Sequence, residues 1–156
     1  MAVEIERKFL VEGDAWRALV TGQRRIRQAY LSTEGDANVR IRLIDERDAK
    51  LTIKSADQSV GGALSRAEFE YPIPIEDARA MLGLRTGLIL DKTRYLVPAG
   101  NGRTWEVDVF AGSHDGLVLA EIELESVEVA VELPGWVGRE VTDDPRYANA
   151  SLARGE

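Results

Sequence analysis

One pattern recurs along most of this chain: charged and apolar residues alternate, and charges of the same sign recur two positions apart. A clear example has Val39, Ile41 and Leu43 alternating with Arg40 and Arg42. Successive side chains of an extended strand point to opposite faces of a sheet. A period of two therefore places the apolar residues on one face and the charged residues on the other. The pattern predicts a mainly β, antiparallel fold in which one face of the sheet is charged.

The same reading along the whole chain gives about eight strands in one domain, residues 1–156, which is long enough to bury a sizeable core. Helical patterns cover three short stretches, near Ala15–Val20, Ile75–Leu82 and Tyr147–Arg154. The polar stretch Ser55–Ser65 has two glycines at its centre and predicts a mobile loop. We therefore expect a β fold flanked by about three short helices.

Composition excludes several classes of function. The chain has no cysteine, so it has no disulfide, no thiolate nucleophile and no Cys-ligated zinc. No apolar run is long enough to span a membrane, and the acidic first strand does not resemble a signal peptide. The net charge of -7 argues against nonspecific binding to nucleic acid. We expect a cytoplasmic protein that has neither a membrane nor a nucleic acid as its partner.

The charged face separates the two signs by strand. For any single pair of charges, a solvated sheet face is the commoner explanation. For the whole set we favour a functional one, because solvated faces usually mix signs and neighbouring like charges repel. The acidic pairs are Glu4/Glu6, Glu68/Glu70, Glu106/Asp108 and Glu121/Glu123, and the basic positions are Lys8, Arg40/Arg42, Lys54 and Lys92/Arg94.

If this sheet closes with its charged face inward, the lumen has an acidic sector and a basic sector. Arginine and lysine side chains that converge in a confined space suit a polyanion, and the arginine fork matches phosphate oxygens. The carboxylates opposite would repel that polyanion unless a hard divalent cation such as Mg²⁺ or Mn²⁺ lies between them. The residues alone thus indicate a metal-dependent site for a polyphosphorylated ligand.

The first strand also carries a motif. Glu4-Ile5-Glu6-Arg7-Lys8 resembles the E-x-E-x-K signature of the CYTH, or triphosphate tunnel metalloenzyme, superfamily. Later motifs follow in the order expected of that family, and the resemblance runs from Glu4 to about Ala153. They are Val39-Arg40-Ile41-Arg42, Thr52-Ile53-Lys54, Glu68-Phe69-Glu70, Lys92-Thr93-Arg94-Tyr95, Glu106-Val107-Asp108 and Glu121-Ile122-Glu123.

The chain most resembles the short bacterial members that hydrolyse inorganic tripolyphosphate. The resemblance implies an eight-stranded antiparallel closed β-barrel and a cofactor of Mg²⁺ or Mn²⁺. It implies that the metal is held by Glu4, Glu6, Asp108, Glu121 and Glu123. It implies that the triphosphate substrate is held by Lys8, Arg40, Arg42, Lys54 and Arg94. It further implies that Tyr30 and Lys92 form the catalytic pair that activates water.

Two other classes of function remain open at this point. One is a different enzyme on the same scaffold: a thiamine triphosphatase, a nucleoside triphosphatase or an adenylate cyclase. The other is a polyphosphate-binding module without catalysis, since a scaffold does not fix a reaction.

A polar lumen also turns the apolar strand faces outward, where three short helices leave part of them uncovered. Large exposed apolar patches usually mark interfaces, so we expect a homodimer. The outward residues are Val39, Ile41, Leu43, Leu51, Ile53, Phe69, Val107, Val109, Ile122 and Leu124.

Overall fold

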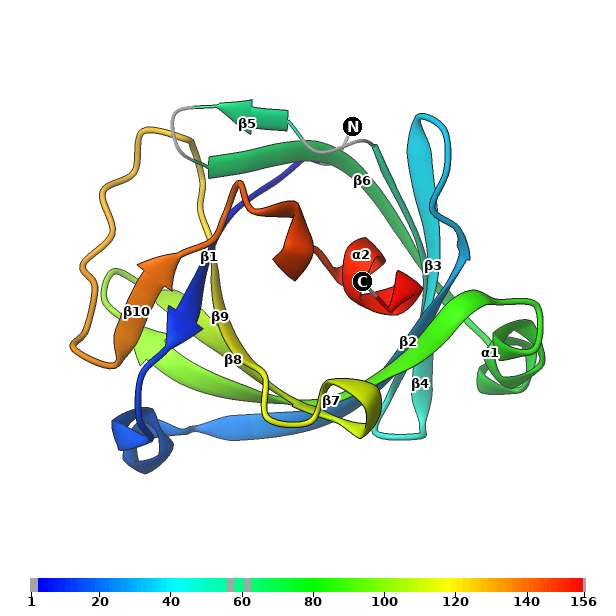
Figure 1. Cartoon of the computed structure of the whole chain (residues 1–156), viewed down its shortest axis with the longest axis horizontal. Coiled ribbons are helices and arrows are strands. Elements are labelled where there is room, and N and C mark those ends of the chain that lie inside the picture. The colour runs from blue at the N-terminus through cyan, green and yellow to red at the C-terminus, as the bar shows by residue number, and fades with distance from the viewer. Residues whose placement is uncertain (1–2, 56–57, 61–62, 156) are drawn as a thin grey trace.

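A computed structural model describes residues 3–55, 58–60 and 63–155, and within them ten strands form one antiparallel sheet (Figure 1). The strands are β1 (Val3–Val11), β2 (Gly22–Ser32), β3 (Ala37–Ile44), β4 (Asp48–Ser55), β5 (Gln58–Val60), β6 (Ala63–Ile73), β7 (Thr86–Ala99), β8 (Arg103–Ala111), β9 (Val118–Glu123) and β10 (Val137–Glu140).

The first strand closes the sheet into a barrel. One edge of β1 pairs with β9. The other edge pairs with β6 along its first half, where Glu4 faces Arg66, and with β10 along its second half, where Phe9 faces Glu140. The ring therefore runs β1-β9-β8-β7-β2-β3-β4-β6 and returns to β1, while β5 and β10 add to its margins. This arrangement confirms the expected eight-stranded closed antiparallel barrel.

Helices are fewer than expected. The helix α1 (Ile75–Leu82) forms where the sequence predicts it. The first predicted helix is instead a 3-10 helix, Ala15–Leu19, and the last divides into a 3-10 turn, Pro145–Tyr147, and the short α2 (Asn149–Arg154). Stretches this short close few i→i+4 bonds, so the tighter 3-10 form competes well. None of the helices in the described ranges is long and apolar enough to cross a membrane.

The prediction of a loop throughout Ser55–Ser65 was wrong in part. Gln58–Val60 forms β5, which pairs with β6, and β6 itself begins at Ala63. The sequence contains too few apolar residues in this stretch to reveal the alternation of a marginal strand. Residues 56–57 and 61–62, which include both central glycines, lie outside the described residues.

The outer wall of the barrel is better covered than we expected. The helix α1 packs its Ala78 and Leu82 against Ile41 and Leu43. On the opposite side, Trp16 of the first 3-10 helix and Trp136 join a cluster on β1, β7, β8 and β9. Several residues expected to be uncovered are therefore buried, namely Ile41, Leu43, Val107, Ile122 and Leu124. Phe69 and Tyr71 on β6 do remain exposed, at 39% and 55%.

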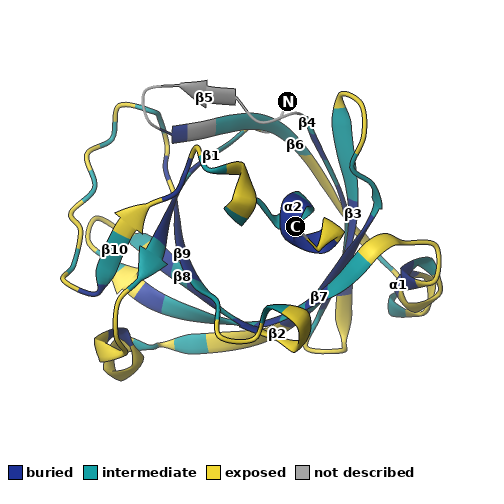
Figure 2. Ribbon diagram, viewed as in Figure 1, coloured by how far each residue is buried: buried dark blue, intermediate teal, exposed yellow. Residues whose placement is uncertain are grey.

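Inside the ring, one end of the lumen is apolar and α2 fills it (Figures 1 and 2). Leu152 and Ala153 of α2 pack against Leu90, Phe110 and Leu119, which come from β7, β8 and β9. His114 Nε2 lies 2.7 Å from the Leu152 carbonyl oxygen. The C-terminal segment thus closes one end of the barrel, and the charged side chains occupy the rest of the lumen.

Gly87 at the start of β7 permits this closure. Its φ is +77°, and a Cβ added there would lie 2.3 Å from the Ala153 carbonyl oxygen. We expect Gly87→Ala to lower the free energy of unfolding by about 2 kcal/mol, from backbone strain and displacement of α2. Urea denaturation followed by circular dichroism measures this. Gly100→Ala is the matched control, because nothing lies within 4 Å of an added Cβ there. Equal stability of the two variants would contradict the close packing.

Candidate active site

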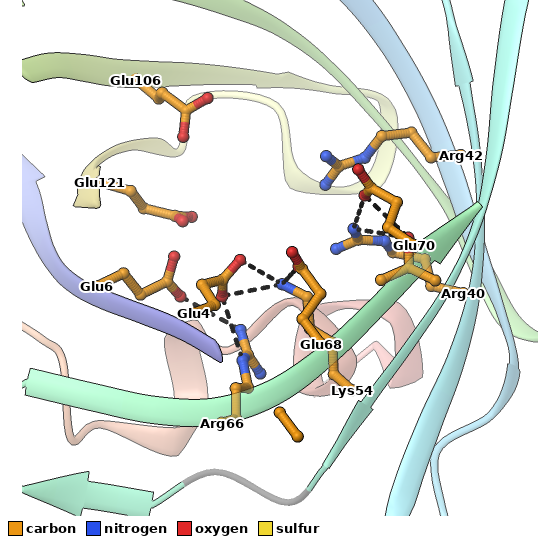
Figure 3. Close-up of polar contacts among 12 residues, drawn as sticks. Glu4, Glu6, Arg40, Arg42, Lys54, Arg66, Glu68, Glu70, Glu106 and Glu121 are labelled. Atoms are coloured by element: carbon orange, nitrogen blue, oxygen red, sulfur yellow. Dashed lines mark hydrogen bonds and ion pairs between the residues drawn. The ribbon is translucent and has the colours of Figure 1, made fainter. Parts of the chain in front are cut away.

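A cavity of about 690 Å³ occupies the charged part of the lumen. Figure 3 shows its two sides: Glu4, Glu6, Glu106 and Glu121 lie apart from Arg40 and Arg42. The separation follows from the strand order. The acids on β1, β9 and β8 stand on three neighbouring strands, and the bases on β3 and β4 stand on another neighbouring pair. The predicted sectors form only in part, because Glu70 pairs with Lys50 and Arg40, Glu68 pairs with Lys54, and Arg94 pairs with Asp108.

Glu4 and Glu6 stand at the seam between β1 and β6. Lys54 Nζ lies 3.0 Å from both carboxylate oxygens of Glu4. Arg66 Nε donates to Glu4 Oε1 at 3.3 Å, and Arg66 Nη2 donates to Glu6 Oε1 at 3.2 Å. Burial raises the pKa of Glu4, but the charges of Lys54 and Arg66 outweigh it and lower that pKa to about 2. Glu4 is consequently a carboxylate at any physiological pH.

Glu6 and Glu121 form a second kind of pair. In the pairing of β1 with β9, Lys8 faces Glu121 and Glu6 faces Glu123, so Glu6 and Glu121 are diagonal neighbours. Burial, followed by the nearby charges of Glu121 and Glu4, raises the pKa of Glu6 well above its ordinary value. Burial also raises that of Glu121, but Lys8 and a hydrogen bond from Glu6 take its pKa well below the ordinary value. The pKa values of the two buried carboxyl groups are thus pushed in opposite directions, as like charges at close range require.

Asp108 lies deeper and is held by cations. Arg94 binds it through two parallel bonds, Nε to Oδ1 at 2.8 Å and Nη2 to Oδ2 at 3.0 Å. Lys92 Nζ is 2.7 Å from Asp108 Oδ2, although not in hydrogen-bond geometry. Burial lowers the pKa of Lys92 to about 8, and the Asp108 carboxylate offsets part of that effect. Asp108 and Lys92 are 1% and 0% exposed, so this cluster lies beneath the cavity wall.

Arg40 and Arg42 have weaker partners than Asp108 and Glu4 have. Arg42 Nε donates to Gln28 Oε1 at 2.8 Å, and Arg40 Nη2 lies 3.9 Å from Glu70 Oε2. Glu70 is shared with Lys50 at 3.1 Å. Burial, then the charges of Arg40 and Arg94, lower the pKa of Arg42 to about 9. The guanidinium stays protonated at neutral pH, and an anion in the cavity would relieve this crowding of positive charge.

A second pocket of about 270 Å³ lies beside the C-terminal segment, where Lys8 and Tyr30 meet Thr142. Lys8 Nζ donates to the Tyr147 carbonyl oxygen at 3.0 Å. Arg66 and Asn149 line both this pocket and the larger cavity. The two spaces therefore meet along shared side chains.

The predicted site residues divide among three places. The larger cavity is lined by Glu4, Glu6, Glu121, Glu123, Arg40, Arg42, Lys54 and Arg94. The second pocket is lined by Lys8 and Tyr30. Asp108 and Lys92 line neither. Tyr30 and Lys92 are on paired strands, but Lys92 faces Ile26, four positions from Tyr30. Among the described residues no hydrogen bond joins Tyr30 to Lys92, and their pairing stays a prediction.

Sequence reasoning missed Arg66. The sequence pattern does place Arg66 on the charged face, because Arg66, Glu68 and Glu70 share the period of two on β6. The pattern does not show that Arg66 reaches Glu4, because the pairing of β6 with β1 depends on barrel closure. In the part of the chain that the structure describes, no three Asp, Glu or His side chains stand together as a ready metal-binding group. Several carboxylates are instead engaged by the protein's own lysines and arginines.

Comparison with known proteins gives the family. The sequence profile of the CYTH domain matches residues 2–154. This chain belongs to the CYTH domain family. Two curated CYTH-like relatives are named inorganic triphosphatase. One, from Acetivibrio thermocellus, is 41% identical over 99% of this chain and 95% of its own length. The other, from Nitrosomonas europaea, is 36% identical over 96% of both chains.

Solved structures agree with the CYTH assignment. A crystal structure of an inorganic triphosphatase has a TM-score of 0.66 and 32% identity, covering 99% of this chain and 96% of that one. A Hippeastrum protein has a TM-score of 0.64 over 79% of this chain and 80% of its own, at 15% identity. The second likeness shows a shared fold alone.

The buried cluster of this CYTH barrel generates a stability prediction. Among the described residues, Asp108 is the one carboxylate that forms ion pairs with both Lys92 and Arg94, and it is fully buried. Asp108→Asn removes that charge. We expect the free energy of unfolding to fall by about 3–5 kcal/mol, because buried Lys92 loses this ion pair and Arg94 retains the one with Glu106. Glu106→Gln is the control: Glu106 contacts the same arginine at 3.1 Å, but its side chain is 32% exposed. Urea denaturation compares them, and similar losses would contradict the assigned role of burial.

Proposed function

We propose that this CYTH protein hydrolyses a triphosphate in its charged cavity, that the substrate is inorganic tripolyphosphate, and that Mg²⁺ or Mn²⁺ is required. The observation that carries the proposal is the cavity itself, which is lined both by carboxylates on β1, β8 and β9 and by the guanidinium groups of Arg40 and Arg42. The two curated relatives named inorganic triphosphatase support it, since this chain aligns with each over nearly its full length.

The basic side supplies the binding groups for a polyanion. We assign Arg40, Arg42, Lys54 and Arg94 to the phosphate oxygens, which guanidinium groups bind through paired hydrogen bonds. Mutual repulsion between Arg40 and Arg42 favours an anion between or beside them. The apolar end of the lumen is filled by α2, so it offers no surface to an organic ring. The cavity lining still includes apolar Ile26, Ile44, Leu96 and Leu124, so the preference for an inorganic chain over thiamine triphosphate or a nucleotide is supported by the relatives named inorganic triphosphatase.

The carboxylates suit a divalent metal. Glu4, Glu6, Glu121 and Glu123 line the cavity and are hard oxygen donors, which Mg²⁺ and Mn²⁺ prefer. The repulsion between buried Glu6 and Glu121, which raises the pKa of Glu6, supports this assignment, because a bound cation would relieve it. Asp108 would join from below if Arg94 turned toward substrate. When bound, the metal would offset charge that develops on the phosphate oxygens.

In the proposed reaction water attacks a terminal phosphorus, the phosphoanhydride bond breaks, and orthophosphate and pyrophosphate leave. We assign Tyr30 to the removal of a proton from that water, with a lysine as its partner. Lys92 is the partner predicted from the sequence. Lys8 is a second candidate, since it lines the same pocket as Tyr30. Arginine charges stabilise the transition state by the ordinary electrostatic mechanism.

A phosphate-release assay tests the function. Tripolyphosphate, thiamine triphosphate and ATP are each incubated with Mg²⁺, Mn²⁺ or EDTA, and orthophosphate is measured with malachite green. We expect release to be fastest from tripolyphosphate and to stop in EDTA. Release that persists in EDTA would refute the metal requirement. Faster phosphate release from ATP would indicate that the substrate is a nucleotide. Binding of a triphosphate without phosphate release would indicate a non-catalytic module.

Variants make the same assay specific to the site. Arg40→Ala removes a charge-assisted contact, and we expect kcat/KM to fall about 10- to 100-fold. Arg25→Ala is the control, because Arg25 pairs with Asp91 outside the lumen at 2.7 Å and carries the same charge. Tyr30→Phe, Lys92→Met and Lys8→Met separate the two candidate pairs. A tyrosine variant with full kcat would exclude Tyr30 as the base.

We also expect a homodimer, formed through the outer face of β4 and β6. Phe69 faces Ile53 and Tyr71 faces Leu51 across these strands, and both aromatics are exposed. Light scattering coupled to size exclusion should give twice the 17.2 kDa chain mass. The double variant Phe69→Lys, Tyr71→Lys should give the single-chain mass, whereas Leu84→Lys at an exposed site beyond α1 should not. A monomeric wild-type protein would exclude the dimer.

A further inference from the structure

Arg66 bridges two of the proposed metal ligands. It stands on β6 directly opposite Glu4, so the two side chains share the lumen face at the closest cross-strand spacing. Its Nε and Nη2 reach Glu4 Oε1 and Glu6 Oε1 at 3.3 and 3.2 Å. The two donors of one guanidinium therefore hold two different carboxylates, as Figure 3 shows. The pairing of strands, rather than a chance side-chain position, puts this cation at the seam.

We propose that Arg66 competes with the divalent metal for Glu4 and Glu6, and that the displaced guanidinium then binds the triphosphate. The inference rests on the proposed function, because it assumes that these carboxylates bind metal. A carboxylate oxygen that accepts a hydrogen bond from a cation is a poorer ligand, and a guanidinium at this distance repels a divalent cation. Both effects have the same sign, so Arg66 weakens metal binding in the protein without substrate.

The other nearby cation does not fit this role. Lys54 contacts Glu4 at 3.0 Å and Glu68 at 3.2 Å, so these contacts do not join Glu4 to Glu6. Arg66 engages Glu4 and Glu6 together, so a metal that takes both carboxylates displaces both contacts. Arg66 also lines the larger cavity and the second pocket. A displaced guanidinium therefore stays within the lumen that receives the anion.

The consequence is coupling between the two ligands. Triphosphate that engages Arg66 frees the carboxylates for metal, and metal that takes the carboxylates frees Arg66 for phosphate. By linkage each ligand raises the affinity for the other. The arrangement favours binding of metal and triphosphate together over binding of either one alone.

Mn²⁺ binding without substrate tests the competition directly. Isothermal titration calorimetry measures the Kd for Mn²⁺ in wild type, Arg66→Gln, Arg66→Lys and Arg103→Gln. We expect Arg66→Gln to bind Mn²⁺ about three- to tenfold more tightly, since one competing cation is lost. Arg103 lines the same cavity but pairs with Glu125, so Arg103→Gln loses the same charge and should match wild type. The same Arg66→Gln variant should show KM for tripolyphosphate raised about tenfold.

Each result decides between causes. Unchanged or weaker Mn²⁺ binding by Arg66→Gln would overturn the competition and make Arg66 a support for the ligands. An unchanged KM would overturn its role toward phosphate. Absence of phosphate release from tripolyphosphate by wild type with Mn²⁺ present would instead refute the proposed function, whatever the Mn²⁺ affinities of the variants. If thermal unfolding shows that Arg66→Gln does not fold, Arg66→Lys decides the question. Its compact ammonium lacks the fork that spans both carboxylates, so its Mn²⁺ affinity must still exceed that of wild type.

Discussion

The structure depends on the neutralisation of like charges that the strand pattern drives into one lumen. Glu4 and Glu6 stand on the strand that closes the barrel, and closure itself brings Arg66 against them. Buried carboxylates without counter-charge would cost several kcal/mol each, so a barrel of this sequence can close only with its cations interleaved. The ion pairs are therefore a condition of the fold as well as parts of the site.

The same requirement explains the division of the lumen into two ends. The interior of an eight-stranded β-barrel is just wide enough for side chains to fill, and in most small barrels those side chains are apolar. Here α2 and the C-terminal segment fill one end, where Leu90, Phe110 and Leu119 point inward. Lys8 links the two ends, since its ammonium binds the Tyr147 carbonyl and lies 3.8 Å from Glu121. Packing fixes one half of the barrel, and it thereby positions the charged half.

The sequence predicts the barrel well because alternation is a local property. Each strand carries its own period of two, and the sectors of charge follow once neighbouring strands are known. Properties that depend on long-range register were not accessible: the pairing of Glu4 with Arg66, and the fork of Arg94 on Asp108. Phe69 was correctly expected to be uncovered, but Ile122 was not, because a non-helical segment that carries Trp136 covers it. Short elements such as β5 and the 3-10 helices lie below what periodicity resolves.

These ion pairs also bear on how the proposed substrate would bind. In the described structure Glu4 is held by Lys54 and Arg66, and Asp108 by Arg94 and Lys92. A metal–triphosphate complex carries both signs of charge. It would exchange each internal pair for two external ones, carboxylate to metal and guanidinium to phosphate. The number of buried charges without partners would then stay nearly constant, so the desolvation cost falls mainly on the ligand. Either component alone would leave one set of protein charges unpaired, which is the physical reason why we expect metal and anion to bind as one unit.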